Sequence, residues 1–279
     1  MDLGDKVVVV TGGGSGIGAA LAEAADEAGA RHVVVADLDG EAAGAVADSV
    51  GGTAATLDVR DEAALAELVR STELAHGGID LFCSNAGFVT QGGVEEPDEV
   101  LQALWEVHVL AHVHAARAVL PSMIERGEGY LLNTASAAGL LTQVGSMGYT
   151  ITKHAAVALA EWLAITHHHQ GIRVSVLCPQ AVRTNITANS PDPAVANPTA
   201  DGPLGVSSAD AVLEADDVAR QCVEAIGEER FWVLPHPEVA TYVAQKADDI
   251  DRWLAGMRRF QARLYGDAPL PGDRIVSGP

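Results

Sequence analysis

From the N-terminus to about residue 180, short valine-rich runs alternate with longer Ala-, Leu- and Glu-rich stretches of helical period. This alternation is typical of βαβ units, so the sequence predicts an α/β fold of Rossmann type: a doubly wound parallel sheet with helices on both faces. The strand-like runs are almost entirely apolar, as a sheet covered on both faces requires. Seven strands are expected, at Lys6–Val10, His32–Ala36, Thr53–Leu57, Ile79–Cys83, Tyr130–Asn133, Ile172–Leu177 and Phe231–Leu234.

The pattern predicts one catalytic domain over residues 1–265, because no internal repeat and no linker separates a second unit. Residues from about 185 to 215 include a stretch rich in Pro, Asn, Asp and Gly, which predicts a long loop on the substrate side. Apolar residues beyond Pro237 recur at three- and four-residue spacing, so one extra amphipathic helix is expected over about 237–265. A flexible tail is expected at 266–279.

The chain is strongly acidic. It has 279 residues with 17 basic and 38 acidic side chains, a formal net charge of −21 at pH 7. A field of that sign repels phosphate backbones and anionic head groups, so nucleic acids and membranes are poor partners. The start of the chain has no signal-peptide core, and the three cysteines are an odd number at wide spacing. We therefore expect a cytoplasmic protein with reduced thiols.

A glycine-rich loop joins the first expected strand to a helix-forming stretch. Glycines let the backbone turn tightly and approach a diphosphate, while the N–H groups at a helix start attract its charge. A glycine-rich loop alone also fits a plain flexible turn, but here the preceding strand and the following helix are both expected. The loop predicts dinucleotide contacts at Gly12, Ser15, Gly16, Ile17 and Gly18.

Asp37 ends the second expected strand, 19 residues beyond Gly18. A carboxylate at this place can bind the adenosine ribose hydroxyls, although an aspartate in a solvated turn is the simpler alternative. It would also repel a 2′-phosphate, and the next two residues, Leu38 and Asp39, add no cation. The sequence therefore favours NAD over NADP as the cofactor.

Tyr149 and Lys153 are four residues apart on a helix-forming stretch, so their side chains share one face. A phenol is a poor base at neutral pH, and a neighbouring cation favours the phenolate. Ser136 follows the fifth expected strand, where its hydroxyl can hold a substrate oxygen against the phenol. The three together predict acid/base chemistry on an alcohol or ketone.

The order and spacing of these motifs resemble the compact branch of the short-chain dehydrogenase/reductase family over residues 5 to about 235. The resemblance implies a nicotinamide-dependent oxidoreductase with Tyr149 as acid/base, Ser136 orienting the substrate oxygen, and Lys153 modifying the phenol and binding the nicotinamide ribose. It also implies a homotetramer or dimer formed through the helices after the fourth and fifth strands. The cofactor contacts that it adds are Asp58, Val59, Asn85, Ala86, Gly87, Pro179, Val182 and Thr184.

Three positions depart from the family pattern. His108 replaces an Asn whose backbone supports a water beside the Lys, so His108 is included among the catalytic candidates, either preserving that relay or joining it. Ser84 stands where an Asn is common. Gln180 replaces a Gly after Pro179, at a place where the side chain would be near the substrate.

The substrate side has little charge in the sequence. The segment 185–215 contains no Lys or Arg, and the approach to Tyr149 is lined by apolar residues such as Leu141 and Val144, which predicts a neutral, mainly apolar secondary alcohol or ketone. Two other functions are considered: an NADPH-dependent ketoreductase, which Asp37 opposes, and a non-catalytic dinucleotide sensor, which the intact Ser, Tyr and Lys oppose. No metal is expected, since consecutive histidines at 167–169 diverge around a helix.

Overall fold

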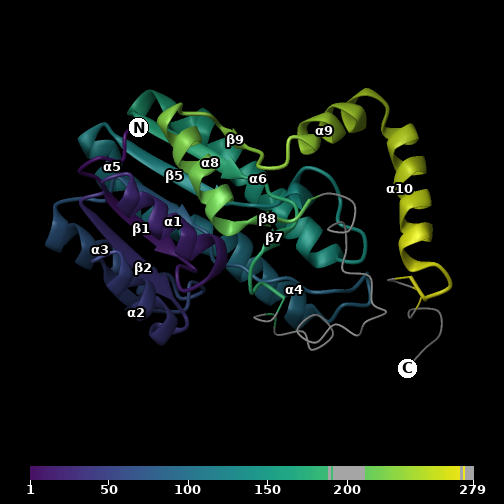
Figure 1. The fold of residues 1–279 in the computed structure, drawn as a ribbon, viewed down its shortest axis with the longest axis horizontal. Coiled ribbons are helices and arrows are strands. Elements are labelled where there is room, and N and C mark those ends of the chain that lie inside the picture. Colours follow the sequence, from purple (N-terminus) through teal and green to yellow (C-terminus); the bar gives the residue numbers. More distant parts are fainter. Residues whose placement is uncertain (188–189, 191–210, 271–272, 274–279) are drawn as a thin grey trace.

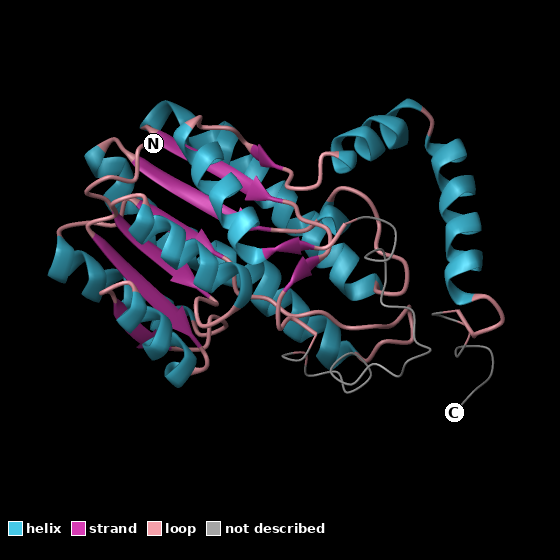
Figure 2. Cartoon of the chain, in the orientation of Figure 1, coloured by secondary structure: helices cyan, strands magenta, loops and turns pink. Residues whose placement is uncertain are grey.

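Seven parallel strands form one sheet in the order β3-β2-β1-β4-β5-β6-β9 (Figures 1 and 2). The computed structural model describes residues 1–187, 190, 211–270 and 273. The strands are β1 Val7–Thr11, β2 His32–Asp37, β3 Thr53–Thr56, β4 Leu81–Ser84, β5 Gly129–Thr134, β6 Ile172–Leu177 and β9 Trp232–Val233. All seven predicted strands are confirmed, with ends shifted by at most two residues.

Helices cover both faces of the sheet because residues along each strand alternate between two apolar clusters. In β1, Val8 and Val10 pack toward one cluster and Val9 toward the other. The first cluster includes α1 Gly16–Glu27, α2 Gly40–Ser49 and α8 Ala215–Gly227. The second includes α3 Glu62–His76, α5 Ala111–Arg126 and α6 Met147–His167. The doubly wound fold is therefore confirmed.

The outermost strand departs from the predicted two-sided burial. Thr53, Ala54 and Thr56 of β3 are exposed, because β3 is the edge strand beyond β2 and is less covered than the central strands. Its short polar and small residues suit that position.

The prediction of one C-terminal helix over about 237–265 is wrong, because two helices occupy this range. They are α9 Glu238–Asp248 and α10 Ile250–Tyr265, separated by Asp249 in an extended conformation. The Asp249 carboxylate accepts a hydrogen bond from the backbone N–H of Arg252 at 2.9 Å, so it starts a new helix instead of continuing the old one. α10 has no buried residue and projects from the body of the molecule (Figure 1).

Of the predicted loop at 185–215, positions 188–189 and 191–210 lie outside the described residues, as do 271–272 and 274–279 of the predicted tail. A two-stranded parallel sheet that the sequence did not predict, β7 Val182–Arg183 with β8 Leu213–Glu214, brackets the loop. Among the described helices, none combines the length and apolar character that a membrane crossing needs.

The strand order reverses between the neighbouring strands β1 and β4. From β1 the chain continues to β2 and β3 on one side of the sheet, and from β4 it continues to β5 and β6 on the other side. In open α/β sheets, ligands bind outside the carboxyl ends of the strands at such a reversal. The residues that follow β1, β4, β5 and β6 therefore meet at one edge.

Candidate active site

A cavity of about 1130 Å³ lies at this edge. Its size exceeds that of a site for one drug-sized molecule, so it has room for a dinucleotide with a substrate beside it. Sixteen of the eighteen residues predicted from the sequence line it: Gly12, Ser15, Gly16, Ile17, Asp37, Asp58, Val59, Asn85, Ala86, Gly87, Ser136, Tyr149, Lys153, Pro179, Val182 and Thr184. Gly18 and His108 lie behind this lining.

The loop after β1 packs so closely that only glycine fits at two positions. A Cβ at Gly18 would lie 2.0 Å from the Gly12 carbonyl oxygen. Gly12 has a φ of +63°, and a Cβ there would approach the Ala86 Cα to 2.7 Å. Gly18 thus shapes the loop from behind, while Gly12 faces the cavity.

The N-terminus of α1 has neither a side-chain cap nor an acidic residue in its first turn. Asp39 and Asp61 cap α2 and α3 through hydrogen bonds to backbone N–H groups. Ser15 at the start of α1 makes no such bond, and the first turn of α1 has no acidic residue. The partial positive charge of this helix end is therefore available to an anionic group in the cavity.

Carboxylates dominate the end of the cavity beyond β2 and β3. Asp37 Oδ2 accepts a hydrogen bond from Gly14 N at 2.9 Å and so holds the glycine loop as well as lining the cavity. Asp58 forms an ion pair of 2.5 Å with Arg60, which holds the pKa of that carboxyl below its usual value. Arg60 lines the cavity too and was missed by the sequence reasoning, but its charge is already paired.

Asn85 ties three strands together at the cavity floor. Its side-chain N–H₂ group donates to the carbonyl oxygens of Thr11 at 3.2 Å and Gly12 at 3.3 Å. Its carbonyl oxygen accepts from the Thr134 hydroxyl at 3.0 Å. Because the amide is fully used in this way, Asn85 fixes the loops after β1, β4 and β5, and its backbone is what remains for a ligand.

The start of α6 carries Tyr149 and Lys153 to the cavity, and both side chains are buried, with 7% and 2% of their surfaces exposed. The Lys153 ammonium lies 5.5 Å from the centre of the Tyr149 ring and donates to the Thr134 carbonyl oxygen at 3.0 Å. Tyr149 is hydrogen-bonded to Ser136, which stands at the end of the segment after β5. The three side chains are thus brought together, as the sequence predicted.

Burial governs the ionisation of this cluster. It raises the pKa of Tyr149 to about 12, against the lowering effect of the hydrogen bond with Ser136. It also lowers the pKa of Lys153 to about 8. Desolvation dominates the pKa of both groups, so the influence of Lys153 on the pKa of Tyr149 stays a prediction.

His108 lies in a π-helical turn, η1 Glu106–Leu110, that joins α4 Asp98–Trp105 to α5. Its Nδ1 is 2.9 Å from the Thr152 hydroxyl, and its Nε2 is 3.2 Å from the Phe88 backbone N–H. Since the N–H of Phe88 can only donate, Nε2 must accept, which places the ring proton on Nδ1. Burial and the charge of Lys153 hold the pKa of His108 well below its usual value, so the ring is neutral.

The neutral ring connects two parts of the site. A Cβ added to Gly87 would lie 3.2 Å from His108 Nε2 and 3.6 Å from Lys153 Nζ, so both side chains press on the loop after β4. The Thr152 hydroxyl is also 3.1 Å from the Tyr149 carbonyl oxygen. His108 therefore links that loop to the helix that carries Tyr149. Sequence reasoning gave no signal for Thr152.

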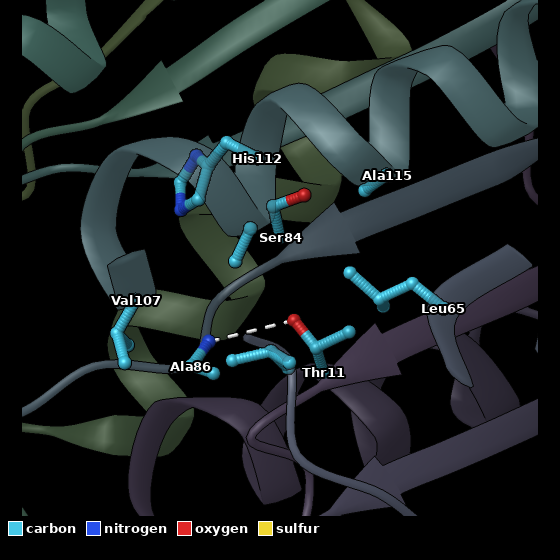
Figure 3. Close-up of a pocket in the computed structure, with 9 residues that line it drawn as sticks. Thr11, Leu65, Ser84, Ala86, Val107, His112 and Ala115 are labelled. Atoms are coloured by element: carbon cyan, nitrogen blue, oxygen red, sulfur yellow. Dashed lines mark hydrogen bonds between the residues drawn. The ribbon is translucent and has the colours of Figure 1, made fainter. Parts of the chain in front are cut away.

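A second, much smaller cavity lies behind the loop after β4, between β1 and α5 (Figure 3). Ser84, at the position where the family commonly has Asn, lines this small cavity and not the large one. His112 lies opposite it; both ring nitrogens are buried without a partner, and burial lowers the pKa of this ring to about 3. Ser84 is thus removed from the chemistry of the large cavity.

His236 fastens the segment after β6, and the sequence gave no indication of it. Its Nδ1 accepts from the Gln180 backbone N–H at 3.2 Å, and its Nε2 donates to the Ala211 carbonyl oxygen at 3.0 Å. The ring thereby joins the residue two positions before β7 to the residue two positions before β8. Val182 and Thr184, two of the predicted cofactor contacts, are held on this segment beside the cavity.

The C-terminal helices border the same cavity. Lys246 of α9 donates to the carbonyl oxygens of Leu140 at 2.8 Å and Leu141 at 3.3 Å, which fixes α9 beside the approach to Tyr149. Tyr242 of α9 and Trp253 of α10 have ring centres 6.3 Å apart, and both line the cavity. Apolar side chains from this arm thus face the substrate side.

Within the part of the chain that the structure describes, no three His, Cys, Asp or Glu side chains are grouped so that they could hold a metal ion. Cys83, Cys178 and Cys222 are buried thiols without disulfide partners.

Comparison with known proteins agrees with this geometry. Residues 6–194 match a family model described as short chain dehydrogenase. The chain is 35% identical over 266 residues to 1-deoxy-11-beta-hydroxypentalenate dehydrogenase of Streptomyces avermitilis, covering 91% of this chain and 93% of that protein. It is 34% identical over 209 residues to 2,5-dichloro-2,5-cyclohexadiene-1,4-diol dehydrogenase LinX of Sphingobium indicum, covering 73% and 83%.

A solved structure is similar over most of both chains. It is a short chain dehydrogenase/reductase from Burkholderia phymatum in complex with NAD, with a TM-score of 0.79 and 31% sequence identity. The alignment covers 90% of this chain and 96% of that one. The architecture around the cavity is therefore shared with a dinucleotide-binding relative.

Proposed function

The chain belongs to the short-chain dehydrogenase/reductase family, and we propose that it is an NAD-dependent oxidoreductase that interconverts a neutral secondary alcohol and the corresponding ketone. The single observation that carries this proposal is the meeting of Ser136, Tyr149 and Lys153 at the end of a cavity that begins at the glycine loop. The relatives named as dehydrogenases of hydroxyl-bearing ring compounds support the reaction class.

The residues present fit a nicotinamide dinucleotide. Gly12 and the uncapped start of α1 would hold its diphosphate, and Asp37 its adenosine ribose. Val182 and Thr184 would hold the carboxamide. When bound, the dinucleotide supplies the group that accepts or returns hydride. Asp37 would repel a 2′-phosphate, and the nearby Arg60 is paired with Asp58, so the site favours NAD over NADP.

The residues of the chain would transfer a proton to or from one oxygen of the substrate. Ser136 would hold the substrate oxygen beside the Tyr149 hydroxyl. In alcohol oxidation, the Tyr149 oxygen would take the hydroxyl proton; in ketone reduction, it would return it. The Lys153 ammonium would hold the nicotinamide ribose and stabilise negative charge on the phenol oxygen as it develops. Burial of both groups excludes water from this transfer.

We assign His108 a positioning role instead of proton exchange, because its ring is neutral and both nitrogens are engaged. Replacing His108 by Asn should lower kcat by about 10-fold through displacement of the loop after β4. The shape of the pH–rate profile between about pH 5 and 8 should not change, since the ring of His108 stays neutral over that range. If the variant loses one limb of that profile, the His108 ring carries a proton in the wild-type reaction, and the positioning role is contradicted.

The apolar arm supports a neutral substrate. Trp253, Met257 and Phe260 of α10 line the cavity together with Leu141 and Val144. Arg183, the cation closest in sequence to the predicted loop, is paired with Glu214 at 2.9 Å. A carboxylate on the substrate would therefore find no partner of opposite charge near Tyr149 except Lys153, among the described residues that line the cavity.

The function is tested by following reduced nicotinamide formation with secondary alcohols and their matched carboxylate derivatives, each with NAD and with NADP. We expect turnover of neutral hydrophobic alcohols and a preference for NAD of about 100-fold in kcat/KM. Preference for the carboxylates would contradict the substrate class, and preference for NADP would favour the alternative of an NADPH-dependent ketoreductase. Tight dinucleotide binding without turnover of any alcohol or ketone would support a non-catalytic sensor.

Subunit contacts are proposed at α6, which leaves Ile151, Trp162 and Ile165 exposed on the surface. Large apolar side chains gathered on one helix are typical of an interface between copies. The predicted dimer or tetramer would bury them, and the mass of the protein in solution tests this.

A further inference from the structure

Gln180 carries a carboxamide that is buried without a partner. Its Nε2 and Oε1 are both shielded from solvent and neither makes a hydrogen bond, while the residue lines the large cavity. The carboxamide of Asn85, in the same cavity, is fully paired with Thr11, Gly12 and Thr134. Because burial of an unpaired amide is costly, the carboxamide of Gln180 is suited to a ligand.

The backbone on both sides of Gln180 is held in place. The Pro179 carbonyl oxygen accepts from Ala137 N at 2.8 Å, and the Ala181 carbonyl oxygen accepts from Leu213 N at 3.1 Å. Between them, Gln180 N donates to His236 at 3.2 Å. The carboxamide is thus carried on a rigid segment, which is how specificity groups are best presented.

The backbone beside Gln180 lies close to Ser136. The Ser136 hydroxyl lies 3.4 Å from the carbonyl oxygen of Pro179, the residue before Gln180, and Ser136 is hydrogen-bonded to Tyr149. A substrate oxygen held by Ser136 and Tyr149 would therefore place its neighbouring carbons near Gln180. A polar group that meets the carboxamide must lie within a few bonds of the carbon that is oxidised or reduced.

The chemistry of the carboxamide selects the kind of group. Its N–H₂ donates and its oxygen accepts, so a hydroxyl, which does both, can satisfy it in full. A carboxylate or a ketone only accepts and would leave the Gln180 oxygen buried and unpaired. A carboxylate would also need a cation, and the arginines of the cavity lining, Arg60 and Arg183, are already paired.

We propose that Gln180 forms a subsite for a second hydroxyl group, so that the preferred substrate is a diol or a hydroxyketone with its two oxygens on neighbouring or nearby carbons. This inference rests on the proposed function, because it places the reacting oxygen at Ser136 and Tyr149.

The test compares cyclohexanol, the two diastereomers of cyclohexane-1,2-diol and 2-hydroxycyclohexanecarboxylate as substrates with NAD. For the wild-type protein, we expect at least one diol to exceed cyclohexanol in kcat/KM by about 10- to 100-fold, with the carboxylate below the diol. Gln180→Leu, which keeps the backbone N–H to His236, should abolish the preference for the diol and leave cyclohexanol turnover within a few fold. Gln180→Asn, which retains a shorter carboxamide, should keep part of the preference.

The outcomes separate this inference from the function on which it rests. Equal turnover of cyclohexanol and both diols by the wild type would overturn the subsite while the oxidoreductase function stands. A Gln180→Leu variant that raises the KM for NAD and keeps the diol preference would also overturn it, because Gln180 would then serve the cofactor. No turnover of any of these alcohols, with the dinucleotide bound, would contradict the proposed function itself. Gln102→Leu on the exposed face of α4 is the control for the same substitution away from the cavity.

Discussion

Tyr149→Phe should lower kcat by about 1000-fold or more, with the affinity for NAD nearly unchanged. The substitution removes the hydroxyl that we propose exchanges a proton with the substrate, and it leaves the ring and its packing in place. The free energy of unfolding should fall by no more than about 1.5 kcal/mol, the usual worth of the hydrogen bond with Ser136. Steady-state kinetics, dinucleotide titration and chemical denaturation measure the three quantities.

The chain offers a matched control for this variant. Tyr130 of β5 is also fully buried, and its hydroxyl is 2.7 Å from that of Ser175, away from the cavity. Tyr130→Phe should cost a similar amount of stability and leave kcat within about two-fold. If Tyr149→Phe and Tyr130→Phe have the same activity, the phenol of Tyr149 is not the acid/base.

The strands and the glycine loop could be predicted because their signals are local. Each central strand is an unbroken apolar run, and burial on both faces forces that composition on it. The loop from Gly12 to Gly18 is dictated by backbone approach at named positions, which glycine alone permits. The pairing of Tyr149 with Lys153 follows from helical period. These features require no knowledge of what packs against them.

The features that the sequence did not reveal depend on contacts between distant segments. The ammonium of Lys153 is held by a carbonyl oxygen of Thr134, and carbonyl oxygens carry no sequence signal. His236 joins residues 56 and 25 positions away from it in the chain. The break between α9 and α10 had a signal, the capping residue Asp249, but the apolar spacing on both sides concealed it.

The pKa of Tyr149 also depends on contacts with distant segments, so the sequence could not predict it. Sequence reasoning considered the attraction between phenolate and ammonium, which depends on their spacing along a helix. Desolvation depends instead on everything that surrounds the pair, and here it dominates both shifts. With a pKa near 12, the phenol is protonated at neutral pH and ready to donate in ketone reduction. Alcohol oxidation, which needs the basic form, should therefore accelerate as the pH rises above neutrality.

Lys153→Met should abolish most activity and at the same time stabilise the protein without its cofactor. We expect kcat/KM to fall by about 100- to 1000-fold, because the variant lacks the ammonium that we propose holds the nicotinamide ribose and stabilises charge on the phenol oxygen. Burial disfavours the ammonium in the folded state and lowers its pKa from 10.5 to about 8. An apolar side chain of similar length removes that penalty, so the free energy of unfolding at pH 7 should rise by about 2 kcal/mol.

The pKa shift of Lys153 determines how the stabilisation by Lys153→Met changes with pH. The folded pKa lies below the unfolded one, so the charge of Lys153 destabilises the fold fully below about pH 8, and the penalty fades as the pH rises from 8 to 10.5. The stabilisation by Lys153→Met should shrink over the same range in denaturation curves. Lys6, paired with Glu128 at the surface, has a raised pKa, so Lys6→Met should instead leave stability unchanged or lower it by about 0.5 kcal/mol. A Lys153→Met protein that is less stable than the wild type at pH 7 would mean that the ammonium holds the site together in the absence of the dinucleotide.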